Sequence, residues 1–433
     1  MKRLALVALS FGLVAATQGS DTMPAPPQTK PVAIKGATIH PVSGPDIASG
    51  TIVFENGKIT AIGGDAAVPA EAEVIDGNGK HVYPGLINAN TVLGLVEIGA
   101  VRSTVDVEES GAINPNVRSL TSVNPDSELI PVARNSGILT ALSVPEGGLI
   151  SGQSAVLRLD GWTPEEMSVV SPAAMHLRWP NMTIDRRPRA RKSMKDQQKE
   201  IDKALKQIRD AFQIARAYAQ ARKNPPADFK TDLRWEAMMP VFEGKLPLFV
   251  HASTLAQIEA ALAWAKEMQL KIVLVDGDDA WRVASQLKET DTPVVLGPAT
   301  SLPPRRDDDY DSGWSAAAKL QAAGVRFCIS SGGRSAETNE RNVGYEAGLA
   351  SGYGLPKEEA LKAVTLYPAQ ILGIADRLGT LEPGKAATLI VTNGDPLDFP
   401  TQVEMAFIDG RKIDLSTRQT RLRDKYREKY RRK

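Results

Sequence analysis

Short apolar runs that alternate with helical patterns constrain the fold of this chain more than any other feature. Two such runs begin near residues 137 and 154, and helical patterns such as 255–268 and 280–287 separate the later ones. Near-continuous apolar strands separated by helices indicate a parallel α/β core. We predict a (β/α)8-type TIM barrel, either regular or irregular in its first half, in preference to an open sheet. The later runs are Leu246-Pro-Leu-Phe-Val, Lys271-Ile-Val-Leu-Val, Thr292-Pro-Val-Val-Leu and Val325-Arg-Phe-Cys-Ile.

Two further β patterns lie at the ends of the chain, in residues 31–81 and 381–415. Both mostly alternate apolar and polar positions, and Asn56-Gly57 is a strong hairpin signal. Chain ends often lie close together on a domain surface, so the two patterns are expected to pair into one small composite β-sandwich. The barrel would then be an inserted domain of residues 82–380.

The first 20 residues have the pattern of a secretory signal peptide. A short basic start precedes an apolar run that is too short to span a membrane, and a cut is expected after Ala16. A buried N-terminal helix is the alternative. The only cysteine, Cys328, rules out an intramolecular disulfide. We therefore expect an exported, periplasmic protein without a transmembrane span, with export to the medium still open.

Charge is balanced over the whole chain but not along it. The net charge of +1 and the aromatic content of 5% give no reason to expect a nucleic-acid partner. A Pro-rich spacer at 21–30 precedes the first β pattern. A basic helix within 182–223 is interpreted as a solvated helix packed on the barrel, with a membrane-surface element as the alternative. The basic tail, 416–433, is expected to be a frayed helix or a contact for anionic lipid or a partner.

The strand pattern around residue 88 predicts a functional site. Asn88 and Asn90 stand two residues apart at the end of a strand, so their side chains should converge on one point with Ala89 turned away. Barrel enzymes place their sites at this end of the strands. His251 is the one histidine at another predicted strand end, and it is either a hydrogen-bonded rim residue or a metal ligand.

The remaining polar motifs are weaker. His40 and His81 lie in the first β pattern and are interpreted as structural, whereas His176 cannot be placed. The acidic run 307–309 is expected to be a surface loop rather than a cation site. The glycine-rich segment 147–153 follows a strand, so its backbone amides are candidates for lining the barrel mouth. The sequence contains neither a Gly-x-Ser-x-Gly elbow nor a Walker-type phosphate loop.

Several motifs in a specific order resemble the metal-dependent amidohydrolase superfamily, near its imidazolonepropionase-like and Xaa-Pro dipeptidase-like branches. The resemblance covers roughly residues 31–412 and implies a metal-bearing (β/α) barrel with a composite β-sandwich, in agreement with the layout above. The motifs are Gly57-Lys-Ile-Thr-Ala-Ile-Gly, Tyr83-Pro-Gly-Leu-Ile-Asn, Ala363-Val-Thr-Leu-Tyr-Pro-Ala-Gln-Ile-Leu-Gly and Leu378-Gly-Thr-Leu-Glu-Pro-Gly-Lys-Ala-Ala-Thr-Leu-Ile-Val.

The resemblance also implies a set of ligand positions. Family members use one or two divalent metals to activate water and polarise a carbonyl. Their His-x-His pair falls here on Asn88 and Asn90, and their fifth-strand histidine falls on His251. The sixth-strand histidine position falls on Asp276, and the eighth-strand aspartate position falls on Ser331.

These substitutions weaken the expected chemistry. Amide oxygens are poor zinc ligands, and a serine cannot replace a carboxylate as general base. The bridging Lys or Glu has no clear counterpart, and Arg158 lies near where it would be sought. At most one divalent metal, such as zinc, is expected, with His251 and Asp276 as its candidate ligands.

Two classes of function therefore stay open. The first is an exported hydrolase of amide, cyclic-amide or dipeptide C–N bonds, with a mononuclear or metal-poor site and a small-molecule or dipeptide-like substrate. The second is a catalytically inactive relative that acts as a binding module or as the partner subunit of an active paralogue. A homo-oligomer, or pairing with a related barrel protein, is compatible with either.

Overall fold

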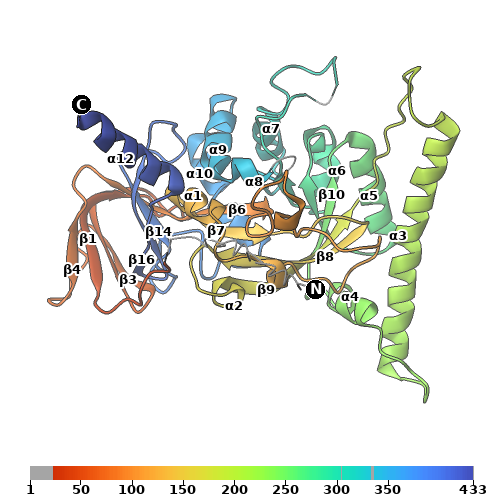
Figure 1. Cartoon of the computed structure of the whole chain (residues 1–433), viewed down its shortest axis with the longest axis horizontal. Coiled ribbons are helices and arrows are strands. Elements are labelled where there is room, and N and C mark those ends of the chain that lie inside the picture. Colours follow the sequence, from red (N-terminus) through yellow and green to blue (C-terminus); the bar gives the residue numbers. More distant parts are fainter. Residues whose placement is uncertain (1–22, 304, 333–335, 433) are drawn as a thin grey trace, which may run out of the picture.

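The computed structural model describes residues 23–432 except 304 and 333–335. The predicted signal peptide lies outside the described residues. Figure 1 shows a central barrel, a second sheet at one end of the molecule and a long helix at the other. Within these residues, each of the two sheets has eight strands.

The first sheet is the barrel. Its strands follow one another in chain order from β6 to β13, and β13 lies against β6, so that the sheet nearly closes. All neighbouring strands are parallel except at β8, which is antiparallel to both β7 and β9. The barrel prediction is confirmed, and its first half is irregular. The strands are β6 Leu86–Thr91, β7 Ile138–Ser143, β8 Ile150–Arg158, β9 Ser168–Arg178, β10 Leu248–Ala252, β11 Ile272–Asp276, β12 Val294–Leu296 and β13 Phe327–Ile329.

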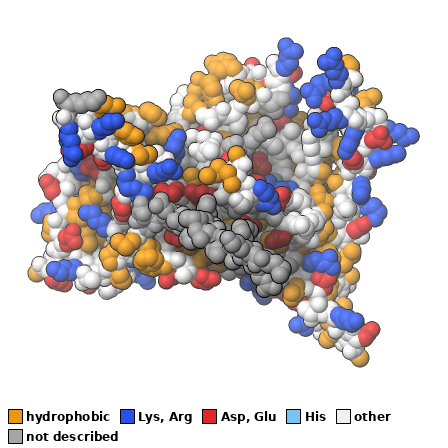
Figure 2. Space-filling view, in the orientation of Figure 1, with side chains coloured by type: hydrophobic (Ala, Val, Ile, Leu, Met, Phe, Trp, Pro, Cys, Tyr) orange, Lys and Arg blue, Asp and Glu red, His pale blue; other side chains and the backbone are white. Residues whose placement is uncertain are grey.

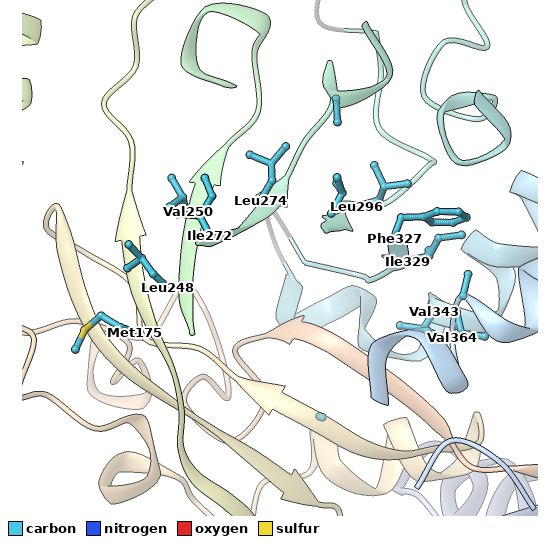
Figure 3. Packing of buried hydrophobic residues seen from close by; sticks show 14 of the residues in the cluster. Met175, Leu248, Val250, Ile272, Leu274, Leu296, Phe327, Ile329, Val343 and Val364 are labelled. Atoms are coloured by element: carbon cyan, nitrogen blue, oxygen red, sulfur yellow. The ribbon is translucent and has the colours of Figure 1, made fainter. Parts of the chain in front are cut away.

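Alternate residues of the barrel strands enter different apolar clusters. Leu248 and Val250 of β10 pack with Ile272 and Leu274 of β11 in the layer between strands and helices (Figure 3). Phe249, by contrast, belongs to a second cluster that fills the barrel interior. Both faces of each strand are thus buried, which explains the near-continuous apolar runs in the sequence.

Helices cover the outside of the barrel and extend it on one side. The longest, α3, spans 30 residues and buries Ile201, Ile208 and Phe212 on one face, which confirms the packed helix predicted within 182–223. The helices are α1 Leu129–Asn135, α2 Pro164–Met167, α3 Met194–Lys223, α4 Leu233–Phe242, α5 Leu255–Glu267, α6 Ala284–Glu289, α7 Ala316–Ala322, α8 Ala336–Asn339, α9 Val343–Gly352, α10 Lys357–Lys362, α11 Leu366–Ile371 and α12 Arg418–Arg431.

The second sheet joins the two ends of the chain, as predicted. β14 pairs antiparallel with β5, and β1 pairs with β2, β4 and β5. Asn56 and Gly57 both have positive φ, the geometry that a two-residue hairpin requires. His40 stacks on Tyr83 and is hydrogen-bonded to His81, in the structural role expected of both histidines. The strands are β1 Val32–Ile39, β2 Ile47–Glu55, β3 Lys58–Gly63, β4 Glu73–Asp76, β5 His81–Pro84, β14 Leu389–Thr392, β15 Val403–Ile408 and β16 Arg411–Lys412.

The Pro-rich spacer and the C-terminal tail, which lie outside the two sheets, differ in how closely they pack on the rest of the protein. In the spacer, Ala25 is buried and its N–H donates to Asp160. The tail forms α12, which has no buried residue. None of the helices in the described part of the chain combines the length and the apolar character needed to cross a bilayer.

Candidate functional site

A cavity of about 660 Å³ lies at the carboxyl ends of the barrel strands. This is the end at which barrel enzymes assemble their sites. Polar residues that line the cavity come from the ends of β6, β7, β9, β10 and β11 or from the turns that follow these strands. Those used below are Asn90, Glu146, Arg178, His251, Asp276 and Asp278.

Four side chains form a hydrogen-bonded chain that starts at this cavity, and we call them the outer cluster: Asn90, Asp276, His251 and His176. Asp276 is partly exposed and the other three residues are buried. Asn90 Nδ2 lies 3.3 Å from Asp276 Oδ1, and His251 Nδ1 lies 3.2 Å from Asp276 Oδ2. His251 Nε2 is 2.9 Å from His176 Nδ1. Because an ionised carboxylate only accepts, His251 donates from Nδ1, and its Nε2 accepts from His176.

The charge states in the outer cluster follow from burial and from Arg178. Burial lowers the pKa of His176 well below its usual value. Burial and Arg178 also lower the pKa of His251, so both imidazoles are neutral near pH 7. Burial alone would raise the pKa of Asp276, but His251, Arg178 and the hydrogen bonds hold it below its usual value. Asp276 has φ of 75°, a left-handed conformation that a non-glycine residue rarely adopts outside constrained sites.

A second group, the inner cluster, consists of Asn88, Thr91, Ser331 and Glu340. Asn88 Nδ2 lies 2.6 Å from both Ser331 Oγ and Glu340 Oε2, and Thr91 Oγ1 is hydrogen-bonded to Glu340 Oε1. All four residues are buried. Burial raises the pKa of Glu340 to about 8, despite the opposing hydrogen bonds from the other three side chains. The Glu340 carboxyl is therefore mainly protonated at neutral pH.

The structure brings the five predicted site residues to one end of the barrel but divides them between the two clusters. The prediction that Asn88 and Asn90 converge is wrong. The register of β6 against β7 shifts between Asn88 and Thr91, so Asn88 joins Glu340 while Asn90 joins Asp276. Ala89 packs in the interior apolar cluster.

The position of Asn90 depends on a glycine on the facing loop. A Cβ built on Gly332 would lie 2.2 Å from Asn90 Nδ2, closer than real atoms approach. Only glycine permits this contact between β6 and the turn after β13. The Ser331-Gly332 pair thus supports both clusters at once.

Two residues near the cavity, His176 and Arg178, were missed or could not be placed from the sequence. His176 and Arg178 lie on β9, in register with Phe249 and His251 of β10. Arg178, rather than Arg158, therefore occupies the strand end next to His251. Arg158 instead forms an ion pair with Asp409 of the composite sheet. Alternating polar residues at the end of the apolar run 173–178 were the available signal.

Arg178 connects the cavity to the glycine-rich segment after β7. Its Nε donates to Ser151 Oγ at 3.2 Å, and its Nη2 donates to the Pro145 carbonyl at 3.2 Å. Glu146 Oε1 lies 3.5 Å from the same Nη2. Burial raises the pKa of Glu146, and Arg178 opposes that rise.

The three aspartates of the acidic run 307–309 differ in their exposure to solvent. Asp307 and Asp309 are exposed, as expected of a surface loop. The Asp308 side chain, however, is 5% exposed and forms ion pairs with Arg282 and Arg305. Two arginines thus engage the middle carboxylate of this run, while the other two face solvent.

Comparison with known proteins agrees with this architecture. A family model described as the amidohydrolase family matches residues 250–414. The crystal structure of an amidohydrolase from Thermotoga maritima superimposes with a TM-score of 0.78 and 27% identity, covering 88% of this chain and 99% of that one. The chain belongs to the amidohydrolase superfamily.

Two curated members of this superfamily are similar over part of their length. Amidohydrolase tasK of Hapsidospora irregularis is 24% identical over 392 residues, which are 83% of this chain and 39% of that protein. The imidazolonepropionase of Porphyromonas gingivalis is 27% identical over 176 residues, 40% of this chain and 38% of the enzyme. The matches therefore span less than half the length of either relative.

The donor set does not fit the metal centre that the superfamily implies. Both ring nitrogens of His251 are already engaged, one by Asp276 and the other by His176. The two positions that the resemblance assigns to the family's histidine pair hold amides, and one of these, Asn88, is hydrogen-bonded to Glu340. Within the described residues, no group of three or more His, Cys, Asp or Glu side chains is arranged to hold a metal ion.

Proposed function

We propose that this superfamily member binds a small molecule in the barrel-mouth cavity without the metal-dependent hydrolysis of its relatives. One observation carries the proposal: the described side chains at the family's ligand positions are hydrogen-bonded to each other. Removing a partner from such a buried network is costly, so the side chains are held in place rather than free to ligate.

The cavity itself supports a binding role. Its volume of about 660 Å³ lies within the range of about 300–1,000 Å³ that is usual for small-molecule sites. Asp276 offers a negative charge at the end of β11, and Arg178 offers a positive charge at the end of β9. Both are held by further hydrogen bonds, so the site is largely pre-formed.

A second candidate is metal-independent hydrolysis of an amide, cyclic-amide or dipeptide C–N bond. Asp276 and Asp278 both line the cavity, and their pKa values move in opposite directions. Burial raises the pKa of Asp278, and Ser253 Oγ lies 2.5 Å from its Oδ2. Such a pair can divide the roles of base and acid. Asp276 would take a proton from the attacking water, and Asp278 would give one to the leaving nitrogen.

Metal analysis with matched histidine variants tests the first proposal. The full chain is dialysed and assayed for zinc and manganese, and His251→Ala is compared with His81→Ala from the composite sheet. We expect substoichiometric metal in all three proteins and no turnover of a dipeptide and lactam panel. Stoichiometric metal that is lost only in His251→Ala would overturn the proposal.

Ligand binding and turnover then separate the two candidates. A thermal-shift screen of the same dipeptides and lactams should raise the Tm of the wild-type chain. Replacement of Arg178 by Gln should abolish that shift, whereas Arg158→Gln should leave it unchanged. Metal-free turnover that is lost in Asp278→Asn would instead establish the second candidate.

Export and pairing with a related barrel protein belong to the same proposal. The N-terminal pattern of residues 1–20 supports export to the periplasm. The N-terminal sequence of the protein recovered from periplasmic extracts would test it, with residue 17 as the expected start. Co-purification of a second barrel protein from the native host would support the partner-subunit role.

A further inference from the structure

The C-terminal helix α12 exposes an apolar stripe. Leu422, Tyr426 and Tyr430 are spaced by four residues and lie on one face of the helix. They are 42%, 48% and 62% exposed, respectively. The start of the helix is fixed, because Thr417 is buried and caps it through the backbone N–H of Thr420. The rest of α12 lies on the surface with no buried residue.

The same helix is strongly basic. Of its 14 residues, seven are Lys or Arg and two are acidic. Arg421 lies 3.7 Å from Glu128 of the loop before α1, which holds the first turn of α12 against the body of the protein. The charge is local, because the whole chain carries a net charge of only +1.

A second basic element lies at the other end of the molecule. The loop before α3 carries five Lys or Arg residues between positions 186 and 192. Figure 1 places this loop and α12 at opposite ends of the same edge of the protein. Figure 2 shows Lys and Arg side chains gathered at both ends of that edge. Two separated basic elements on one edge can contact a flat surface together.

We propose that this edge docks on a lipid surface that carries anionic headgroups, with α12 lying in the headgroup layer. Basic side chains are attracted to anionic headgroups, and the attraction falls off within about a Debye length. Tyrosine rings favour the membrane–water interface, and an apolar stripe beside basic residues is typical of helices that lie in it. A nucleic acid or an acidic protein would use the charge of α12 but would not require Leu422.

Vesicle flotation with the full chain tests the proposal. Wild-type protein should float with vesicles of phosphatidylcholine and phosphatidylglycerol but not with phosphatidylcholine alone. Raising the salt from about 0.1 M to 1 M should reduce binding at least tenfold, because the Debye length shortens from about 10 Å to 3 Å. Equal binding to both kinds of vesicle, or none to either, would overturn the proposal.

Two variants separate charge from insertion. Leu422→Ser with Tyr426→Ser should lower vesicle binding about tenfold, whereas Lys35→Gln with Lys58→Gln, which removes charge from the composite sheet, should not change it. Far-UV circular dichroism should be the same for both double variants. The lipid proposal would be overturned in favour of an acidic protein partner by two results together. The wild-type protein would bind soluble polyglutamate as tightly as vesicles, and the Leu422→Ser, Tyr426→Ser variant would bind both as tightly as the wild type does.

Discussion

The inner and outer clusters occupy the same end of the same barrel but have opposite electrostatic character. The inner cluster is fully buried, and its carboxyl group, on Glu340, is protonated at neutral pH because its pKa is raised to about 8. The outer cluster touches the cavity, and its carboxyl group, on Asp276, is ionised. The difference shows that the strand ends of one superfamily member can be divided between a structural network and a ligand-facing one.

The largest effect should come from removing the inner carboxyl. Glu340→Ala leaves Asn88 and Thr91 without their buried partner and opens a small void. Each unsatisfied polar group costs about 1–3 kcal/mol, so we expect the free energy of unfolding to fall by about 4 kcal/mol. Urea denaturation measures it. Glu337→Ala, three residues earlier and partly exposed, is the matched control and should change stability by less than about 0.5 kcal/mol.

The pH dependence of Glu340 gives the next largest effect. Its pKa is raised from 4.5 in the unfolded chain to about 8 in the folded protein, so the folded state binds the extra proton between these values. Stability therefore falls as pH rises through this window. Between pH 5 and 8 the wild type should lose about 3 kcal/mol relative to Glu340→Gln, which stays neutral. Parallel stability curves for the two proteins would show that Glu340 is already ionised at pH 5.

The fold could be read from the sequence far more completely than the site. The apolar strands and the Asn56-Gly57 turn depend on residues that are close together in the sequence. Their patterns therefore predicted the barrel and the composite sheet. The hydrogen-bond partners of the Asn88 side chain, by contrast, depend on a register shift in β6 and on Glu340, which lies about 250 residues away in the chain. Period-two alternation holds only in a regular strand, so it cannot reveal such a shift.

Neutralising the outer carboxylate, Asp276, should change the free energy of unfolding by less than the Glu340 variants do. Its pH dependence should also run in the opposite direction to that of Glu340. Asp276 has a folded pKa below its unfolded value of 3.8, so it stabilises the protein above that value and loses this contribution as pH falls through the folded pKa. Asp276→Asn should therefore lower stability by about 1 kcal/mol at pH 7 and by less near pH 3. A larger loss at pH 3 than at pH 7 would contradict an ionised Asp276.

The smallest effect on stability, and the sharpest on function, is expected for Asp278. Asp278 is an exposed residue at the rim of the cavity, and its carboxyl group accepts a hydrogen bond from Ser253 Oγ. Asp278→Asn should therefore change the free energy of unfolding by less than about 0.5 kcal/mol. Because that variant remains folded, any change in ligand-induced Tm shift or in turnover reports the cavity alone. An Asp278→Asn protein that is destabilised as much as Asp276→Asn would show that the network extends from Asp276 to Asp278. In that case Asp278, like Asp276, would contribute to the stability of the fold, and the contrast between structural and ligand-facing carboxylates would not coincide with the two clusters.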